Sequence, residues 1–361
     1  MSEQVYKKLA KVLDTLPNGF PESETGVEIK ILKNIFSPED AELFCDMRLS
    51  FETPEQIAQR TGRPLAGMDE HLKQMQAKGQ IFGINFGEVS VYRMYPWVFG
   101  IFEFQLKRMT KELAELCREY EDTFGAQFFT SKVPLMNVVP VEQEIASNEI
   151  SMPFEQVSSI IENGESWAVN DCICKKEHEL LGEPCERPME VCLAIAPIPN
   201  FFTEDHPMGA RAITKKEAYD ILKLSEEKGL VHLTSNVETG HYFICNCCSC
   251  CCGILRGVNK YAGATGVNSN YYAQINADEC VSCGVCADER CQVFAIEEGD
   301  DAYEVIKEKC IGCGLCVSTC PSEAISMIRK NEADIVLPPV DEKEWYARRG
   351  KLRGVDYSQF A

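Results

Sequence analysis

The sequence is poor in basic residues and lacks the common nucleotide-binding motifs. It has 36 Lys and Arg against 56 Asp and Glu, which gives a formal net charge of −20. Because phosphate binding relies on Lys and Arg, this balance disfavours a nucleic-acid partner and suits a basic patch on a redox protein instead. There is no G-x-G-x-x-G and no G-x4-G-K-[ST] motif, so nothing indicates a nicotinamide or nucleotide site, although flavin sites often leave no signature. No Ser–His–Asp or paired-carboxylate arrangement can be recognised either.

Long apolar segments are also missing. The longest candidate, residues 94–104, is too short to span a bilayer and contains Glu103. The N-terminal residues show no apolar stretch before a small-residue cleavage site, so we expect no signal peptide. The expectation is a cytoplasmic protein without a transmembrane segment. Because that compartment keeps thiols reduced, the 20 Cys are expected to bind metal rather than to form disulfides.

Eight cysteines towards the C-terminus form two runs of closely similar spacing. The first is C-x2-C-x2-C-x4-C from Cys280 to Cys291, and the second is C-x2-C-x2-C-x3-C-P from Cys310 to Pro321. Three thiolates at this spacing on a tight loop can reach three irons of one cubane. Zinc sites usually pair two C-x2-C knuckles across a longer gap. The spacing therefore favours iron–sulfur clusters over zinc here.

With these runs, residues 272–332 resemble the bacterial two-[4Fe–4S] ferredoxins. The resemblance implies a ferredoxin-like domain and two clusters. It puts Cys280, Cys283, Cys286 and Cys320 on the first cluster, and Cys310, Cys313, Cys316 and Cys291 on the second. The first run departs from the pattern, because four residues (287–290) precede Cys291 and no Pro follows it. Asp288 and Glu289 in this longer loop should lower the potential of a nearby cluster. Clusters of this class are oxygen-sensitive, which fits an anaerobic setting.

Twelve further cysteines precede the ferredoxin-like part. Two of them, Cys45 and Cys117, lie in N-terminal helices and are expected to be buried apolar residues, and the other ten form two groups. One group could close around a third cubane: Cys172, Cys174, Cys185 and Cys192. The other is more crowded: Cys245, Cys247, Cys248, Cys250, Cys251 and Cys252. Adjacent side chains point in different directions, so the last six cannot all face one four-site cluster. Two cubanes with spare thiols, one cubane beside a thiolate-rich cluster, and a zinc knuckle all remain open.

The N-terminal part is predicted to be a winged-helix-like domain. Helices are expected over 27–35, from Ser37, from Thr53 and over 68–77, followed by a hairpin over 80–95. Such a helix–turn–helix could read DNA. However, Asp69 and Glu70 lie where base contacts would be made, and residues 1–150 carry 16 Lys and Arg against 23 Asp and Glu. Docking or dimerisation is the preferred role.

The whole layout predicts an α+β protein. We expect a winged-helix-like domain with a long helix at 1–135, a Cys-rich iron–sulfur domain at 136–270, the ferredoxin-like domain at 271–332, and a tail at 333–361. Residues 133–141 should be a linker. The basic residues Arg348, Arg349, Lys351 and Arg353 make the tail either a docking arm or a solvated helix. This order of parts resembles a family of iron–sulfur proteins of anaerobic bacteria, whose members look like electron-transfer subunits of larger oxidoreductases.

The predicted function is electron transfer through three to four [4Fe–4S] clusters, as a non-catalytic subunit that serves a flavoprotein or metalloenzyme. The acidic ferredoxin end, with Asp278 and Glu279, is the expected place for electrons to enter or leave. One alternative is a redox enzyme with a substrate-reactive cluster at 245–252. Another is a redox-sensing DNA-binding regulator. The sequence identifies neither the partner, nor its substrate, nor the direction of electron flow.

Overall fold

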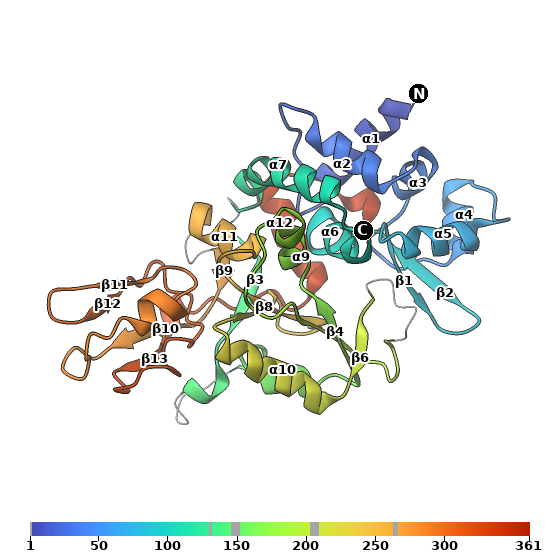
Figure 1. Ribbon diagram of the computed structural model, residues 1–361. Helices are drawn as coiled ribbons and strands as arrows, with labels where there is room; N and C mark the ends of the chain where they lie inside the picture. Colours follow the sequence, from blue (N-terminus) through green and yellow to red (C-terminus); the bar gives the residue numbers. More distant parts are fainter. Residues whose placement is uncertain (1, 130–131, 146–151, 203–208, 263–265) are drawn as a thin grey trace.

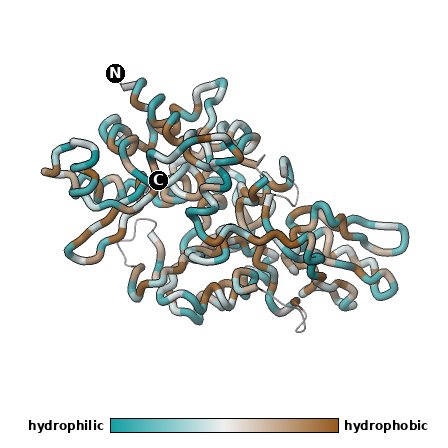
Figure 2. The backbone as a smooth tube through the Cα atoms, turned by 180° about the vertical axis from the view of Figure 1, so that it is seen from behind, coloured by the Kyte–Doolittle hydropathy of each residue, from teal (hydrophilic) through white to brown (hydrophobic). Residues whose placement is uncertain are grey.

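The computed structural model describes residues 2–129, 132–145, 152–202, 209–262 and 266–361. Helices and strands are mixed, and Figure 1 shows three regions: N-terminal helices above, a central sheet, and a small domain of hairpins at one side. In Figure 2, hydrophobic residues recur along the central strands, whereas the outer loops of the small domain are largely hydrophilic. Among the described residues, none of the helices combines the length and the apolar character needed to cross a membrane.

The N-terminal region contains the helices that the sequence predicts, at closely matching positions. They are α2 (Val27–Ile35), α3 (Pro38–Phe44), α4 (Pro54–Thr61) and α5 (Met68–Ala77). Ser37 and Thr53 form the capping boxes that start α3 and α4. The hairpin follows as β1 (Phe82–Asn85) paired with β2 (Ser90–Arg93). An additional helix, α1 (Ser2–Thr15), was not predicted.

A turn and a long helix connect this region to the sheet. The turn includes residues Trp97–Ile101 and α6 (Phe102–Phe104), and the helix is α7 (Lys111–Phe128). Thr110 caps α7 by accepting a hydrogen bond from the backbone N–H of Leu113. Helix α7 packs against α2 and against α9 (Ile173–Leu180) of the middle region. The helix therefore lies at the junction of the two regions.

A seven-stranded sheet forms the middle of the molecule, in the order β6-β4-β5-β8-β7-β3-β9. Its strands are β3 (Met136–Val139), β4 (Ser166–Asp171), β5 (Glu190–Ala196), β6 (Arg211–Ile213), β7 (Val231–Ser235), β8 (Phe243–Cys247) and β9 (Val267–Asn268). All pairs are antiparallel except β3 with β9. Residues 133–141, predicted as a linker, thus contribute a strand. All four residues of β3 are buried, and a strand buried on both faces lacks the alternation that identifies strands in a sequence.

Helices cover both faces of the sheet. On one face, α8 (Val157–Glu162) and α10 (Lys215–Glu227) pack in a core with residues of β4, β5 and β8. On the other face lie α9 (Ile173–Leu180) and α11 (Gly253–Gly257), which Figure 1 shows between the sheet and the N-terminal helices. The Cys-rich segments begin at the ends of β4 and β8, so the sheet places them on the same side as α9 and α11.

The C-terminal domain contains two small two-stranded sheets. The outer strands, β10 (Tyr271–Ile275) and β13 (Ile325–Arg329), pair with each other. Between them, β11 (Ile296–Glu298) pairs with β12 (Tyr303–Val305). The two cysteine runs occupy the loops that follow β10 and β12. Pairing of the first strand with the last therefore brings Cys320, just before β13, close to the first run.

The last segment of the chain is not a solvated arm. It forms α12 (Glu342–Arg353), in which Trp345, Tyr346 and Arg349 are buried. Arg349 donates to Asn18 at 3.1 Å, and Arg353 forms an ion pair with Asp14 at 2.9 Å. The predicted docking arm or solvated helix is thus a packed element. Two of its cations, Arg349 and Arg353, bind the end of α1 and the residues that follow it.

Candidate metal centres

The first cysteine run converges with Cys320 around a small hollow. The hollow is lined by Cys280, Cys283, Cys286 and Cys320, together with Tyr303. Backbone N–H groups of Tyr303 and Ser282 hydrogen-bond to Cys280 and lower the pKa of its thiol. Such N–H···S bonds stabilise thiolate, which is the form that binds metal. We call these four residues the first ferredoxin set; they are the four that the resemblance placed on one cluster.

The second run gathers with Cys291. Cys310 accepts a hydrogen bond from the Ala273 N–H at 3.4 Å, and Cys291 accepts one from the Ala295 N–H at 3.1 Å. Cys313 and Cys316 both lie close enough to Cys291 and Cys310 to interact with them electrostatically, and burial raises the pKa of Cys313 to about 12. These four residues form the second ferredoxin set. Both sets consist of free cysteines, and four convergent thiols are what a cubane takes.

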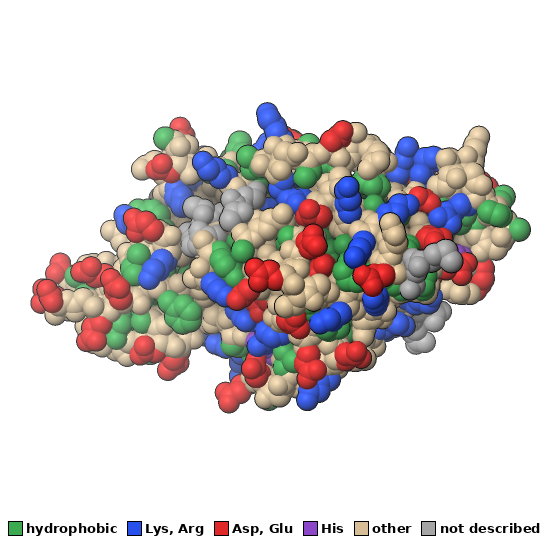
Figure 3. Space-filling view, turned by 90° about the horizontal axis from the view of Figure 1, so that it is seen from above, with side chains coloured by type: hydrophobic (Ala, Val, Ile, Leu, Met, Phe, Trp, Pro, Cys, Tyr) green, Lys and Arg blue, Asp and Glu red, His purple; other side chains and the backbone are tan. Residues whose placement is uncertain are grey.

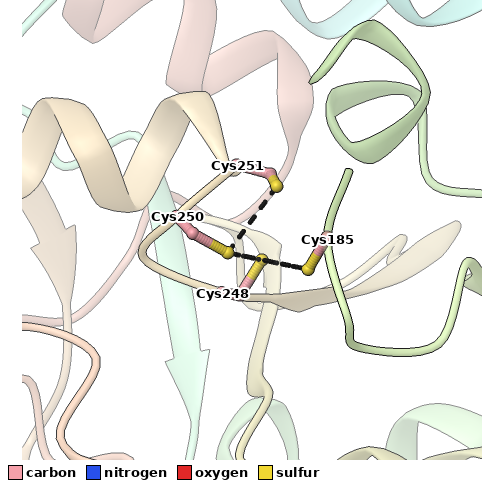
Figure 4. Close-up of side chains that lie close together, drawn as sticks. All are labelled: Cys185, Cys248, Cys250 and Cys251. Carbon is pink, nitrogen blue, oxygen red and sulfur yellow. Dashed lines mark hydrogen bonds between the residues drawn. The ribbon is translucent and has the colours of Figure 1, made fainter. Parts of the chain in front are cut away.

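A third group lies in the middle domain and is shown in Figure 4. The sulfur atoms of Cys185, Cys248, Cys250 and Cys251 all lie within 4.8 Å of one another. Cys185 comes from the loop after α9, and the other three come from the loop between β8 and α11. A hydrogen bond from Cys251 lowers the pKa of Cys248 to about 5. We call these residues the four-thiol set.

The remaining six cysteines of the middle domain form a second, larger group. Hydrogen bonds between neighbouring thiols link Cys192 to Cys245, Cys245 to Cys247, Cys247 to Cys252, Cys252 to Cys174, and Cys174 to Cys172. The sulfurs of Cys247 and Cys252 are 3.2 Å apart. A hydrogen bond from Cys192 lowers the pKa of Cys245 to about 5. We call these residues the six-thiol set.

This grouping differs from the prediction, which placed Cys185 with Cys172, Cys174 and Cys192. The sheet explains the difference. Leu193 faces Ile244 across β5 and β8, so Cys192 and Cys245 are neighbours on the opposite face, and Cys247 follows Cys245 on that face because side chains alternate along a strand. Cys185 lies in a separate loop beyond α9, where it meets Cys248, Cys250 and Cys251. None of the ten thiols is left without a thiol neighbour.

Two cationic side chains near the four-thiol set, Lys175 and Arg187, were not predicted from the sequence. Lys175 is fully buried, and its Nζ donates to the Pro188 carbonyl at 2.6 Å. Arg187 points its Nη1 at the sulfur of Cys250, 3.8 Å away. The position of Lys175 directly after Cys174, in an otherwise acidic chain, was the one sign in the sequence of a cation near the thiols. Only the tertiary structure brings Lys175 towards Cys248, and its positive charge lowers the pKa of the Cys248 thiol.

A direct contact joins the middle domain to the ferredoxin sets. The backbone N–H and the hydroxyl of Ser249, between Cys248 and Cys250, donate to Gln292 Oε1 at 2.9 and 3.0 Å. Gln292 follows Cys291 of the second ferredoxin set, and Cys316 of that set interacts electrostatically with Cys286 of the first. Cys251 and Cys252 are adjacent in the chain but belong to different sets. The order of neighbouring sets is therefore the first ferredoxin set, the second ferredoxin set, the four-thiol set and the six-thiol set.

A cavity of about 420 Å³ lies beside the thiols, between α7, α9 and α11. Cys174 of the six-thiol set and Cys251 of the four-thiol set belong to its wall, and the wall also includes Glu103 and Glu177. Burial raises the pKa of Glu103 to about 8 and that of Glu177 to about 7. The wall also contains many aromatic residues, among them Trp97, Phe99, Phe102, Tyr120, Phe124 and Tyr261.

Comparison with known proteins identifies part of the chain. Residues 273–327 match the family model described as "4Fe-4S dicluster domain". A stretch of 62 residues is 36% identical to the NADH-quinone oxidoreductase subunit I of Pelobacter propionicus. This stretch spans 14% of the present chain and 33% of the relative, so the likeness concerns a third of that protein. No solved structure matches.

The C-terminal domain is therefore an iron–sulfur domain, and the protein binds at least two [4Fe–4S] clusters. The geometry fits this finding, because two sets of four free cysteines converge in that domain.

Proposed function

We propose that this protein relays electrons through three to four metal–sulfur centres and serves as a subunit of a larger oxidoreductase complex. When bound, the clusters supply one-electron redox chemistry at potentials that the protein tunes through hydrogen bonds, charge and burial. The first ferredoxin set would hold one cluster and the second ferredoxin set another. The six-thiol set would hold a third, thiolate-rich centre, because six ligands exceed the four that one cubane takes.

The observation that carries this proposal is the contact between Ser249 and Gln292. It fastens the loop of Cys248 and Cys250 to the residue next to Cys291, so thiol sets of two domains are held at fixed separation. The thiol sets extend from Cys283, which is exposed, to the six-thiol set, in which Cys247 and Cys252 are buried. The NADH-quinone oxidoreductase subunit to which the chain is similar supports a role in electron transfer within a complex.

The surface around the first ferredoxin set suits a basic redox partner. Figure 3 shows Asp and Glu gathered at the end of the molecule where this domain lies. The exposed acids there include Asp278, Glu279, Asp288, Glu289, Glu297, Glu298, Asp300 and Asp301. A surface of one sign steers a partner of opposite charge and raises its association rate. We propose that electrons enter or leave here, through a flavoprotein or metalloenzyme partner.

We propose a docking or dimerisation role for the N-terminal helices and hairpin, in a winged-helix-like arrangement. The acidic start of α5 takes part in packing, because Asp69 binds Lys73 at 2.7 Å and accepts from the Tyr92 hydroxyl at 2.9 Å. Arg60 and Arg63 are paired with Glu52 and Asp46, so neither is free to bind phosphate. Near the hairpin tip, Phe86 is 59% and Val89 49% exposed, as a protein contact would require.

Iron and acid-labile sulfide counts on the full chain, purified without oxygen, test the relay. Two cubanes account for about eight irons per chain. The relay requires a wild-type iron count above eight. A Cys172→Ser variant should lower the iron count towards eight, because it removes a ligand of the six-thiol set. Cys45→Ser is the matched control, because Cys45 is buried among the N-terminal helices and should leave the count unchanged. A wild-type count of eight that Cys172→Ser does not alter would refute a relay into the middle domain.

The cavity favours a second candidate, a redox enzyme whose reactive centre is the six-thiol set. Cys174 lies in the cavity wall, so a substrate there would reach this set directly. Mössbauer spectroscopy of the iron-loaded chain distinguishes the two functions. An iron with a ligand other than thiolate or sulfide would favour the enzyme, whereas complete sulfur ligation would favour the relay.

A further inference from the structure

The four-thiol set does not share the spacing of the sets that hold cubanes. Within the described part of the chain, it alone has its ligand atoms all within 4.8 Å of one another. In a cubane each thiolate binds a different iron corner, so the four sulfurs stand farther apart than when they share one ion. Neither ferredoxin set has its four sulfurs gathered within 4.8 Å, whereas the four-thiol set does.

The individual distances match a single tetrahedral ion. The sulfur of Cys185 lies 3.8 Å from Cys248 and 3.6 Å from Cys250, and Cys250 lies 3.3 Å from Cys248 and 3.6 Å from Cys251. Zinc binds thiolates at about 2.3 Å in tetrahedral geometry, which places ligand sulfurs about 3.8 Å apart. We propose that Cys185, Cys248, Cys250 and Cys251 bind one Zn²⁺ as a closed structural site, and that this site is not a fourth iron–sulfur cluster.

The surrounding charges fit a tetrathiolate zinc site, whose net charge would be −2. Lys175 is fully buried, and no ion pair with a carboxylate is found for it among the described residues. A buried ammonium needs a compensating negative charge, and the thiolates would provide it. Arg187, at 3.8 Å from the Cys250 sulfur, supplies a second positive charge at the exposed side.

The position of the site explains what the zinc would do. It ties the loop after α9 to the loop between β8 and α11, and the second of these loops binds Gln292 through Ser249. Cys252, the next residue after Cys251, belongs to the six-thiol set. A redox-inert ion here would fix the six-thiol set and the second ferredoxin set relative to each other. This role rests on the proposed relay, but the metal assignment does not.

Metal analysis and X-ray absorption on the full chain test the assignment. The anaerobically purified protein should contain about one zinc per chain after dialysis against EDTA, with a zinc-edge spectrum of four sulfurs at about 2.3 Å. Cys250→Ser should abolish EDTA-resistant zinc and leave the iron content unchanged. Cys117→Ser is the control, because Cys117 is buried on α7 and should keep both metals.

Three other outcomes would overturn the proposal. The first is a chain without zinc in which Cys250→Ser removes about four irons, since the set would then hold a cubane and the relay would gain a centre. The second is zinc that Cys250→Ser does not displace, because the ion would then lie elsewhere. The third is zinc that EDTA removes at once from the wild-type chain, which would mark an adventitious ion only. If Cys250→Ser fails to fold, Cys185→Ser, in a separate loop, provides the same comparison.

Discussion

The guanidinium of Arg290 donates to the backbone carbonyl of Glu226 at 2.7 Å, and thereby joins the C-terminal domain to the end of α10. It also donates to the carbonyls of Glu227 at 3.0 Å and Leu315 at 3.2 Å. The last carbonyls of a helix lack partners within the helix, and a cation there is favourable. Arg290 is one of the four residues between Cys286 and Cys291, a segment one residue longer than its counterpart in the second cysteine run. The departure from the ferredoxin pattern thus provides an anchor between two domains.

Replacing this anchor should loosen the C-terminal domain. Arg290→Ala leaves buried carbonyls unpaired, and hydrogen bonds to charged groups contribute about 1.5–3 kcal/mol each. We expect the free energy of unfolding to fall by roughly 2–4 kcal/mol, together with faster hydrogen exchange in the last turn of α10. Urea denaturation and exchange mass spectrometry measure both effects. Arg211→Ala is the control, because its ion pairs with Glu190 and Glu217 are exposed and should contribute less than about 1 kcal/mol.

Double variants should show which thiols share a centre. Cys247→Ser and Cys192→Ser both alter the six-thiol set, so the double variant should lose no more iron than the more severe single variant. Cys247→Ser combined with Cys320→Ser alters two sets, so the iron losses should add. Iron analysis and cluster absorbance provide the measurement. Additive losses for Cys247 with Cys192 would show that these thiols bind different centres.

Neutralising the acidic end of the C-terminal domain should slow electron transfer to a basic acceptor. We expect the combined variant Asp288→Asn, Glu289→Gln, Asp300→Asn and Asp301→Asn to reduce the rate with a basic c-type cytochrome about tenfold at low salt. Stopped-flow mixing at several ionic strengths should also show a flatter salt dependence, since screening has less charge to act on. Replacing Glu39, Glu55 and Glu88 by Gln, on the exposed N-terminal surface, should have little effect. Equal slowing by both sets would point to net charge rather than to a docking site.

The stability of the fold should decrease in mild acid because of His178. Burial and the positive charges of Arg118 and Arg256 lower the pKa of His178 from 6.5 to about 4, against a smaller opposing effect of Glu183. Between these pH values the unfolded chain binds more protons at this residue than the folded one, so unfolding becomes easier as the pH falls from about 6.5 towards 4.

A His178→Gln variant should therefore show a shallower loss of stability between pH 7 and pH 5 than the wild-type protein. Anaerobic urea denaturation at the two pH values provides the comparison. An unchanged slope would show that other groups, such as His241, whose pKa burial also lowers to about 4, account for the acid sensitivity.

Much of the N-terminal region follows from local sequence signals. Val27–Ile35 and Met68–Ala77 have helical periodicity, and Ser37 and Thr53 are followed three residues later by Asp40 and Gln56, which complete the capping boxes. Strand β3 and the burial of helix α12 were not predicted, for a different reason. Both depend on burial by segments that are far away in the sequence. The local sequence of residues 136–139 or 342–353 gives no indication of which segments these are.

The metal sites show the same division. The sequence by itself determined that the C-terminal domain carries two [4Fe–4S] clusters, because three thiols at regular short spacing on one loop can reach one metal centre. Only the tertiary structure decided how the other ten thiols divide. Their partners lie on separate strands and loops, and the alternation of side chains along β8 directs Cys245 and Cys247 to one side of the sheet, while the loop beyond α9 carries Cys185 to Cys248, Cys250 and Cys251.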